Sequence, residues 1–147
     1  MIIHSLSLKD CSMEVVEKIK ILDQQYFPFP WTDQQWAEAV NKNSFHLFFN
    51  QNLSSFILFS LSPAEALAHL VKILVDPLEQ QKGLGSQILG TSHQNLKLLG
   101  FERTFLEVES SNQAALKLYD RMGYKKIHFK KKFYSNGADA HIMEKHL

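Results

Sequence analysis

Residues 75–90 read VDPLEQQKGLGSQILG and connect two segments of different periodicity. The run before them, Leu67 to Val75, is rich in apolar and β-forming residues, and Asp76-Pro77 closes it. After the glycines, apolar residues recur at helical spacing as far as Leu99. This stretch therefore predicts a strand, a glycine-containing turn and a helix, in that order.

The turn is also a candidate site for an anion. Gly83 and Gly85 stand at the expected helix start, where backbone N–H groups can face a ligand without a Cβ in the way. A helix start adds roughly half a positive charge, so a pyrophosphate would fit. Lys82 precedes the glycines and no Gly-Lys-Ser/Thr follows, which excludes a Walker A loop; a G-x-G-x-x-G fingerprint is also missing. Taken in isolation, a Gly-x-Gly before a helix is more often a plain turn than an anion site.

The elements on either side of this stretch indicate the fold class. Apolar and alternating runs predict strands over residues 2–8, 45–49, 53–61, 67–75, 103–109, 127–133 and 138–147. A first helix is expected through Val15 and Tyr26, a second opens at Thr32, a third runs from the glycines at 83 and 85 to Leu99, and a fourth is opened by Asn112 as N-cap and stopped by Gly123. We therefore expect an α/β (α+β) chain with a single mixed, mostly antiparallel sheet of about seven strands and helices on both faces.

The segment between the first two helices has strong local signals. Phe27-Pro28 and Phe29-Pro30 must end the first helix, since a residue before proline avoids helical geometry. Thr32 with Gln35 matches a capping box, and Trp31 with Trp36 matches the hydrophobic staple that accompanies one. We expect Trp36 to be structural and Trp31 to serve both structure and binding.

Composition and charge narrow the class of protein. The 147 residues carry 16 Lys plus Arg against 15 Asp plus Glu, a net charge of +1, so no basic field favours a nucleic-acid partner. With no linker-like tract, one domain over residues 1–147 is expected. No apolar run reaches the roughly 18 residues needed to cross a membrane, and the start does not read as a signal peptide. We expect a cytoplasmic protein.

Cysteine and histidine usage gives no metal or disulfide signal. Cys11 is the single cysteine, so no disulfide can form within the chain. The seven histidines show no metal-ligand spacing, and no metal cofactor is expected. The basic run Lys130-Lys131-Lys132 is typical of a solvated sheet edge, although it could also steer an acidic partner or a CoA phosphate.

A family resemblance gives these motifs a function. The run Val75-Asp76-Pro77, the segment Gln80 to Gly85, the strand around Leu106-Glu107-Val108 and the helix beginning at Asn112 resemble the signature of the GNAT family of acetyl-CoA-dependent N-acetyltransferases. The resemblance implies that acetyl-CoA, the co-substrate, enters a gap where one strand splays from its neighbour at a bulge. The implied cofactor-binding residues are Ile73, Leu74, Val75, Gln81, Lys82, Gly83, Leu84, Gly85, Ser86 and Asn112.

Two further residues take catalytic roles by the same resemblance. Glu107 occupies the family position of the general base that deprotonates the acceptor amine, and Tyr119 occupies that of the acid that protonates the leaving thiolate. From the residues alone, Glu107 also fits a solvated surface carboxylate and Tyr119 fits core packing. Asn112 is a sound helix cap whether or not it contacts CoA.

The acceptor is expected to be a protein N-terminus. Segments near Phe29-Pro30-Trp31 and Phe133-Tyr134 resemble Nα-acetyltransferases, including those acting on the N-terminal alanine of ribosomal protein S18, and imply substrate-binding roles for Phe29, Trp31 and Tyr134. Phe133 departs from the second tyrosine that relatives often carry, which leaves the accepted peptide sequence open. Two alternatives remain: acetylation of a small amine such as a polyamine or aminoglycoside, and a non-catalytic CoA-binding module.

Overall fold

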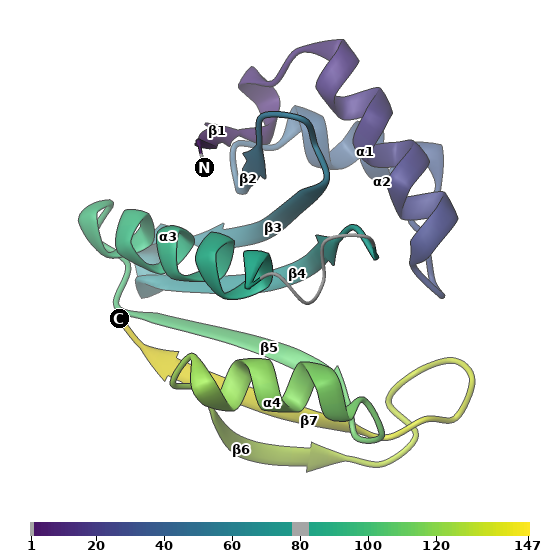
Figure 1. Cartoon of the computed structure of the whole chain (residues 1–147), viewed down its shortest axis with the longest axis vertical. Coiled ribbons are helices and arrows are strands. Elements are labelled where there is room, and N and C mark those ends of the chain that lie inside the picture. The colour runs from purple at the N-terminus through teal and green to yellow at the C-terminus, as the bar shows by residue number, and fades with distance from the viewer. Residues whose placement is uncertain (1, 78–82) are drawn as a thin grey trace.

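The structure is a computed structural model that describes residues 2–77 and 83–147. Within these residues, seven strands and four α-helices follow one another (Figure 1). The elements are β1 (Ile3–Ser7), α1 (Met13–Tyr26), α2 (Asp33–Asn41), β2 (Phe45–Asn50), β3 (Ser55–Ser62), β4 (Leu67–Val75), α3 (Leu84–Leu98), β5 (Arg103–Glu109), α4 (Gln113–Arg121), β6 (Lys125–Lys130) and β7 (Ala140–His146), with short 3-10 turns at Leu8–Asp10 and Pro63–Glu65.

The strands form one sheet in the order β1-β2-β3-β4-β5-β7-β6. Every neighbouring pair is antiparallel except β4 and β5, which are parallel. The expected mixed, mostly antiparallel sheet is confirmed. A parallel pair requires a crossover, and α3 supplies it between the two central strands.

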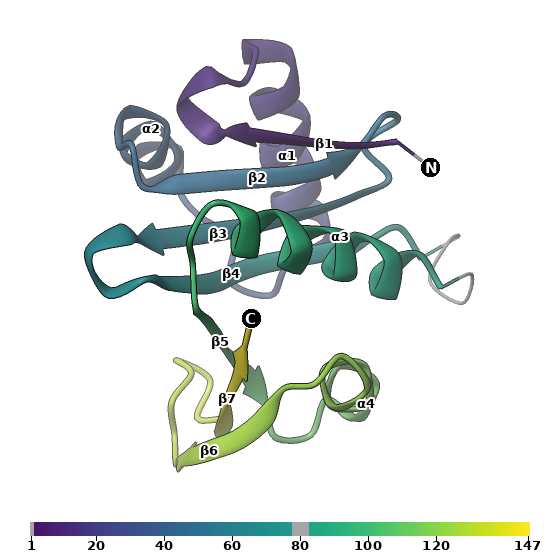
Figure 2. The same ribbon diagram turned by 90° about the vertical axis from the view of Figure 1, so that its left-hand side faces the viewer.

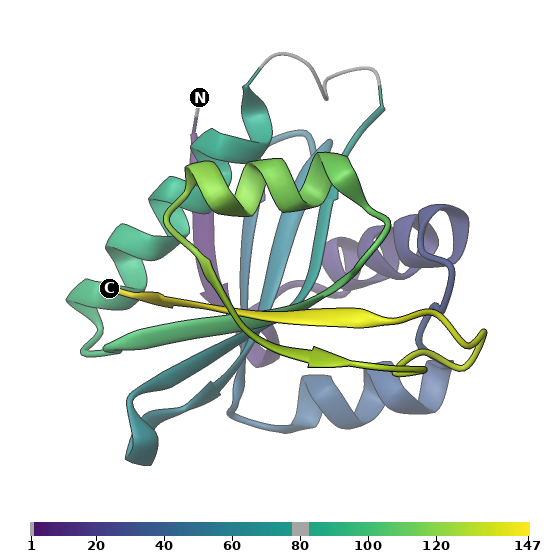
Figure 3. The same cartoon turned by 90° about the horizontal axis from the view of Figure 1, so that it is seen from below.

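Helices cover both faces of the sheet, as expected (Figures 2 and 3). Alternating strand residues divide the apolar side chains between two cores, since successive side chains point to opposite faces. Phe48, Ile57 and Phe59 pack with Ile88 and Leu89 of α3. Their neighbours along the strands, including Leu47, Phe56 and Leu58, pack instead with Ile19 of α1 and Trp36 of α2.

A bulge in β4 breaks this alternation at Val71. Lys72 pairs with Leu58 and Leu70 pairs with Phe59, so Val71 is an extra residue without a partner position on β3. Val71 and Lys72 consequently both face α1 and α2, whereas Leu70 and Ile73 face α3. The bulge changes which side chains β4 presents to each face of the sheet in its second half.

The predicted start of α2 is confirmed in detail. Thr32 Oγ1 accepts from the Gln35 N–H at 3.1 Å, and Gln35 Oε1 accepts from the Thr32 N–H at 2.8 Å. The rings of Trp31 and Trp36 pack with centroids 4.7 Å apart. Local sequence alone therefore fixes how the chain enters this helix.

The strand predicted over residues 127–133 is displaced. β6 runs from Lys125 to Lys130, and Phe133 lies in the following loop. Lys132 has a φ of 51°, which ends the extended geometry, and its N–H donates to Asp139 Oδ1 at 2.9 Å. Among residues 2–77 and 83–147, no helix is both long and apolar enough to cross a membrane.

Candidate active site

The parallel strands at the centre of the sheet separate after three residue pairs. β4 and β5 pair at Leu67–Arg103, Ala68–Thr104 and His69–Phe105, and their pairing stops there. The two ribbons diverge toward the ends that lead to α3 and α4 (Figure 1). The splayed strand pair that the resemblance implied is therefore present.

A cleft of about 740 Å³ lies on the α3 and α4 side of this opening. Its walls come from β4, the start of α3 and one side of α4, including Ile73, Val75, Gly83, Gly85, Ser86, Asn112, Ala115, Leu118, Tyr119 and Arg121. Its volume lies within the range of small-molecule sites. Most of the residues expected to bind the acyl donor thus line one cavity.

Gly83 has a φ of 77°, a left-handed conformation that suits glycine, and it precedes the first turn of α3. A Cβ built on Gly85 would meet Val75 Cγ2 at 3.5 Å and Leu118 Cδ2 at 3.7 Å, so the glycine leaves the space between β4 and α4 open. The side chain of Asn112 caps α4 by accepting from the Ala115 N–H at 3.2 Å.

Two expected cofactor-binding residues are placed differently, and two more are not described. Leu74 points to the α1 and α2 face and packs in that core, so its side chain does not line the cleft. Leu84 is buried and does not line the cleft. Gln81 and Lys82 lie outside the described residues.

Glu107 faces the other side of the opening and is paired with a histidine. His69 Nε2 lies 2.6 Å from Glu107 Oε2, and because a carboxylate only accepts, the imidazole N–H is the donor. The His69 ring stacks on Phe105 with centroids 4.2 Å apart and an interplanar angle of 8°, which fixes its orientation. The side chain of Glu107 is 22% exposed, so it remains accessible to an acceptor.

No pattern in the sequence distinguishes His69 from the other six histidines. Its partner lies 38 residues away, and only the parallel register of β4 and β5 brings the two together. The sequence shows only that His69 lies within an apolar strand, which is too weak a signal to select it.

Tyr119 lies in the wall of the cleft and is 5% exposed. Its ring makes an edge-on contact with Tyr124 at 5.6 Å. Burial, and to a smaller extent the nearby Tyr134 phenol, raises the pKa of Tyr119 well above its ordinary value, so the phenol is protonated at neutral pH. Tyr119 therefore packs in the core and also borders the cleft.

Tyr134 and Phe29 close the α1 and α2 side of the opening. Their rings stack with centroids 6.1 Å apart and an interplanar angle of 5°. Burial raises the pKa of Tyr134, and the negative charges of Glu107 and Glu109 raise it further, so its phenol lies within electrostatic range of both carboxylates. The loop before α2 and the loop before β7 thus meet next to Glu107.

Trp31 does not join Phe29 at this opening. Its ring packs on Trp36 and makes an edge contact with Phe45 at 5.7 Å, within the α1 and α2 core. Trp31 was expected to serve both structure and binding, and its contacts show the structural role.

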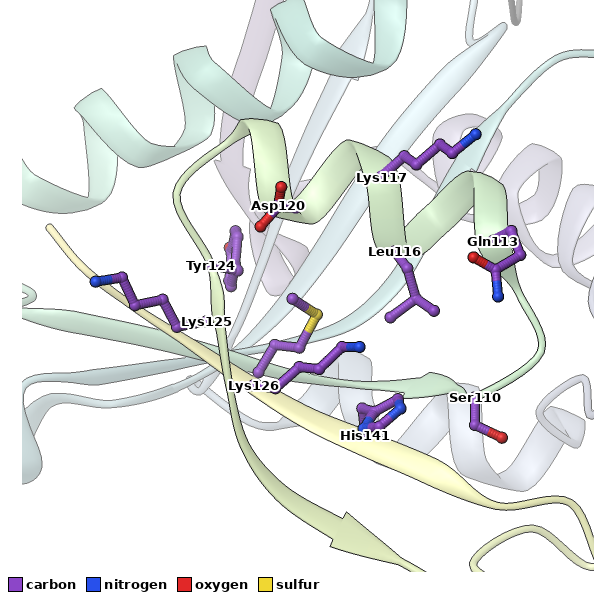
Figure 4. A pocket seen from close by; sticks show the side chains of 10 residues that line it. Ser110, Gln113, Leu116, Lys117, Asp120, Tyr124, Lys125, Lys126 and His141 are labelled. Carbon is purple, nitrogen blue, oxygen red and sulfur yellow. The ribbon is translucent and has the colours of Figure 1, made fainter.

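A second groove of about 640 Å³ lies on the opposite side of α4 (Figure 4). Leu116 and Lys117 of α4 border it, and Lys126 and His141 form its other wall. None of the expected site residues lines this groove. Within the described residues, no group of three or more His, Cys, Asp or Glu side chains is arranged to hold a metal ion.

Known proteins with similar sequences and folds are acetyltransferases. The model of the Acetyltransferase (GNAT) family matches residues 14–124. The [ribosomal protein bS18]-alanine N-acetyltransferase of Escherichia coli is 30% identical over 127 residues, which cover 83% of this chain and 84% of that protein.

Solved structures agree on the fold. The ribosomal-protein-S18-alanine N-acetyltransferase from Escherichia coli superposes with a TM-score of 0.80 at 24% identity, covering 99% of this chain and 94% of that one. A chain of the NatC complex bound to Gag peptide and CoA superposes with a TM-score of 0.84 at 18% identity, covering 100% and 99%. With its splayed central strands, its glycine-bounded cleft and this family match over most of its length, the chain belongs to the GNAT family of acetyltransferases.

Proposed function

We propose that this N-acetyltransferase transfers the acetyl group of acetyl-CoA to the N-terminal α-amine of a protein, with the N-terminal alanine of ribosomal protein S18 as the first acceptor to test. The observation that carries this proposal is the arrangement around Glu107, which lies at the splayed strands with His69 as its hydrogen-bond donor and the Phe29–Tyr134 stack beside it. Nα-acetyltransferases among the similar proteins support the class of acceptor.

Glu107 is suited to take a proton from the acceptor. A terminal α-amine has a pKa of about 7.7 to 8.0, so most of it is protonated at neutral pH and cannot attack. The carboxylate accepts one hydrogen bond from His69, and its other lone pairs are available to an ammonium group. His69 in turn keeps the carboxylate facing the opening.

The opposite side of the opening fits the acyl donor. The residues around Gly83 and Gly85 would hold its pyrophosphate at the start of α3, and the edge of β4 near Ile73 would pair with its extended arm. When bound, acetyl-CoA supplies the activated acyl group. Tyr119 holds a protonated phenol in the wall of this cleft and is the donor available for the departing sulfur.

The phenol of Tyr134 is suited to contact the leading residues of a peptide. It lies within electrostatic range of Glu107, is protonated at neutral pH, and can donate a hydrogen bond to a peptide carbonyl. Phe29 adds an apolar surface next to it, with 43% of its area exposed. Together the two rings offer a peptide one hydrogen-bond donor and one apolar wall.

A panel of acceptors tests the proposal. Thiol release from acetyl-CoA is measured with peptides that begin with Ala, Ser or Met, with the same peptides blocked at the α-amine, and with polyamines and aminoglycosides. Mass spectrometry then locates the acetylated nitrogen. We expect turnover only with free α-amines and the highest kcat/KM for an S18-type N-terminal alanine.

Each other outcome has a defined meaning. Acetylation confined to small amines or to lysine side chains would overturn the Nα proposal and support the small-amine alternative. Acetyl-CoA binding without turnover of any acceptor would support a non-catalytic CoA-binding module. Faster turnover of Ser or Met peptides than of Ala peptides would support the α-amine as the acceptor group and reject the N-terminal alanine of S18 as the preferred acceptor.

A further inference from the structure

A buried carboxylate ties together the elements around the acceptor side. Asp23 of α1 is fully buried. Its Oδ2 accepts from the backbone N–H of Trp31 at 2.9 Å and from the Nε1–H of Trp36 at 3.0 Å, and its Oδ1 accepts from Lys72 Nζ at 2.6 Å. One side chain therefore joins α1, the α1–α2 loop, α2 and β4.

The ammonium group of Lys72 is enclosed to an unusual degree. The side chain is 5% exposed, and its Nζ lies 4.7 Å from the ring centroid of Phe27 and 4.9 Å from that of Trp31. Burial lowers the pKa of Lys72, while the bond to Asp23 and that carboxylate's charge favour the charged form. A buried ammonium is costly unless it is paired, so Lys72 and Asp23 depend on each other.

The ion pair of Asp23 and Lys72 connects the acyl-donor side of the proposed site to its acceptor side. Lys72 directly precedes Ile73, which lines the acyl-donor cleft, and it reaches Asp23 only because the bulge at Val71 turns it away from that cleft. On the other side, Asp23 holds the backbone of Trp31, two residues from Phe29. Phe29 carries the stack with Tyr134 beside Glu107.

We propose that Asp23 and Lys72 are positioning residues for the acceptor: their ion pair holds the α1–α2 loop against β4 and so fixes Phe29 at the acceptor opening. The proposal rests on the proposed function, because it assigns Phe29 to the acceptor side. Neither residue touches the reacting atoms. Their effect is therefore expected on acceptor binding and not on acetyl-CoA binding.

A purely structural role makes a different prediction. A buried ion pair that only supports the fold would lower the folded fraction, which reduces kcat and leaves both KM values where they were. A positioning role raises the KM of the acceptor alone, since β4 keeps its cleft-facing residues while the loop moves. The ratio of the two KM values separates these roles.

The main variant is Lys72→Met, which keeps the length and apolar stem of the side chain and removes its charge. The matched control is Lys20→Met, because Lys20 of the same region pairs with Asp33 at 3.1 Å on the surface, where the Asp33 side chain is 92% exposed. We expect the acceptor KM of Lys72→Met to rise by about tenfold or more, with the KM of acetyl-CoA within about twofold of the parent. Lys20→Met should match the parent in both.

A second readout does not depend on activity. Trp31 and Trp36 are the two tryptophans of the sequence, and both bond to Asp23. Acrylamide quenching of their fluorescence therefore reports directly on this part of the loop, and it should increase in Lys72→Met and not in Lys20→Met. If Lys72→Met does not fold, Trp36→Phe removes one donor to Asp23 without stranding a charge, and it should raise the acceptor KM and the quenching of Trp31 in the same direction.

The possible failures are distinguishable. A parent protein that acetylates no peptide α-amine rejects the proposed function, and the KM test is then made with whichever acceptor the parent uses, or by quenching alone if it uses none. An unchanged acceptor KM, equal rises in both KM values, or unchanged quenching in the folded variant overturns the positioning role of Asp23 and Lys72.

Discussion

Replacing Glu107 with glutamine tests the proposed base with little disturbance of its surroundings. Gln has the same size, and its amide oxygen can still accept the hydrogen bond that His69 donates at 2.6 Å. What it loses is the capacity to take a proton. The mutation therefore separates proton transfer from the geometry of the His69 contact.

The expected loss has two parts. At pH 7 an amine of pKa about 7.7 to 8.0 is neutral in only about one molecule in six to eleven, which limits the simple deprotonation gain to about tenfold. Positioned general-base catalysis as a whole contributes about 10² to 10⁴. We expect kcat of Glu107→Gln to fall by about 10² or more at pH 7, with acetyl-CoA affinity nearly unchanged.

The pH dependence makes the test sharper. Raising the pH from 7 to 9 supplies neutral amine from solvent, so kcat/KM of Glu107→Gln should recover by about sixfold to tenfold and no further. Initial rates of thiol release at both pH values, with acetyl-CoA binding measured by calorimetry, provide the data. Glu109→Gln is the matched control, because Glu109 lies on the same face of β5 and bonds Ser111 instead. A Glu107→Gln rate within about threefold of the parent at pH 7 would refute the assignment.

Three further predictions concern single side chains. Tyr119→Phe should lower kcat by about 10² or more while acetyl-CoA binding and the ring contact with Tyr124 persist, as steady-state kinetics and calorimetry will show. Thr32→Ala removes one bond of the capping box and should lower the free energy of unfolding by about 1 kcal/mol and the Tm by about 2 to 4 °C, measured by thermal melts. Burial, chiefly, lowers the pKa of His93 from 6.5 to about 4, so the native state resists a proton that the unfolded chain accepts. The contribution of this group to the free energy of unfolding is complete above pH 6.5 and is lost toward pH 4. Denaturant unfolding at pH 7 and at pH 5 measures this loss. Between these two pH values, the free energy of unfolding should fall by about 2 kcal/mol less in His93→Gln than in the parent.

Local signals in the sequence predicted local structure well. The capping box of Thr32 and Gln35 involves residues three apart, and the structure contains both of its hydrogen bonds. Gly83 stands where a positive φ precedes α3. Strand periodicity predicted the number of strands, because the sequence of each strand is either mostly apolar or alternates between apolar and polar residues.

Features that depend on distant residues were not predictable in the same way. The end of β6 depends on a bond from the Lys132 N–H to Asp139, seven residues on, so Phe133 was wrongly included in the strand. The pairing of His69 with Glu107 depends on the register of two parallel strands. The burial of Lys72 depends on a one-residue bulge that the apolar run around it conceals.

The extra residue at Val71 makes the length of β4 as important as its composition. If the same residues paired regularly, with Val71 opposite Leu58, the Lys72 ammonium would point into the space proposed for the acyl donor and Ile73 would turn toward Asp23. Alternation counted from the start of β4 therefore assigns Lys72 and Ile73 to the wrong faces, and the register with β3 is needed to place them.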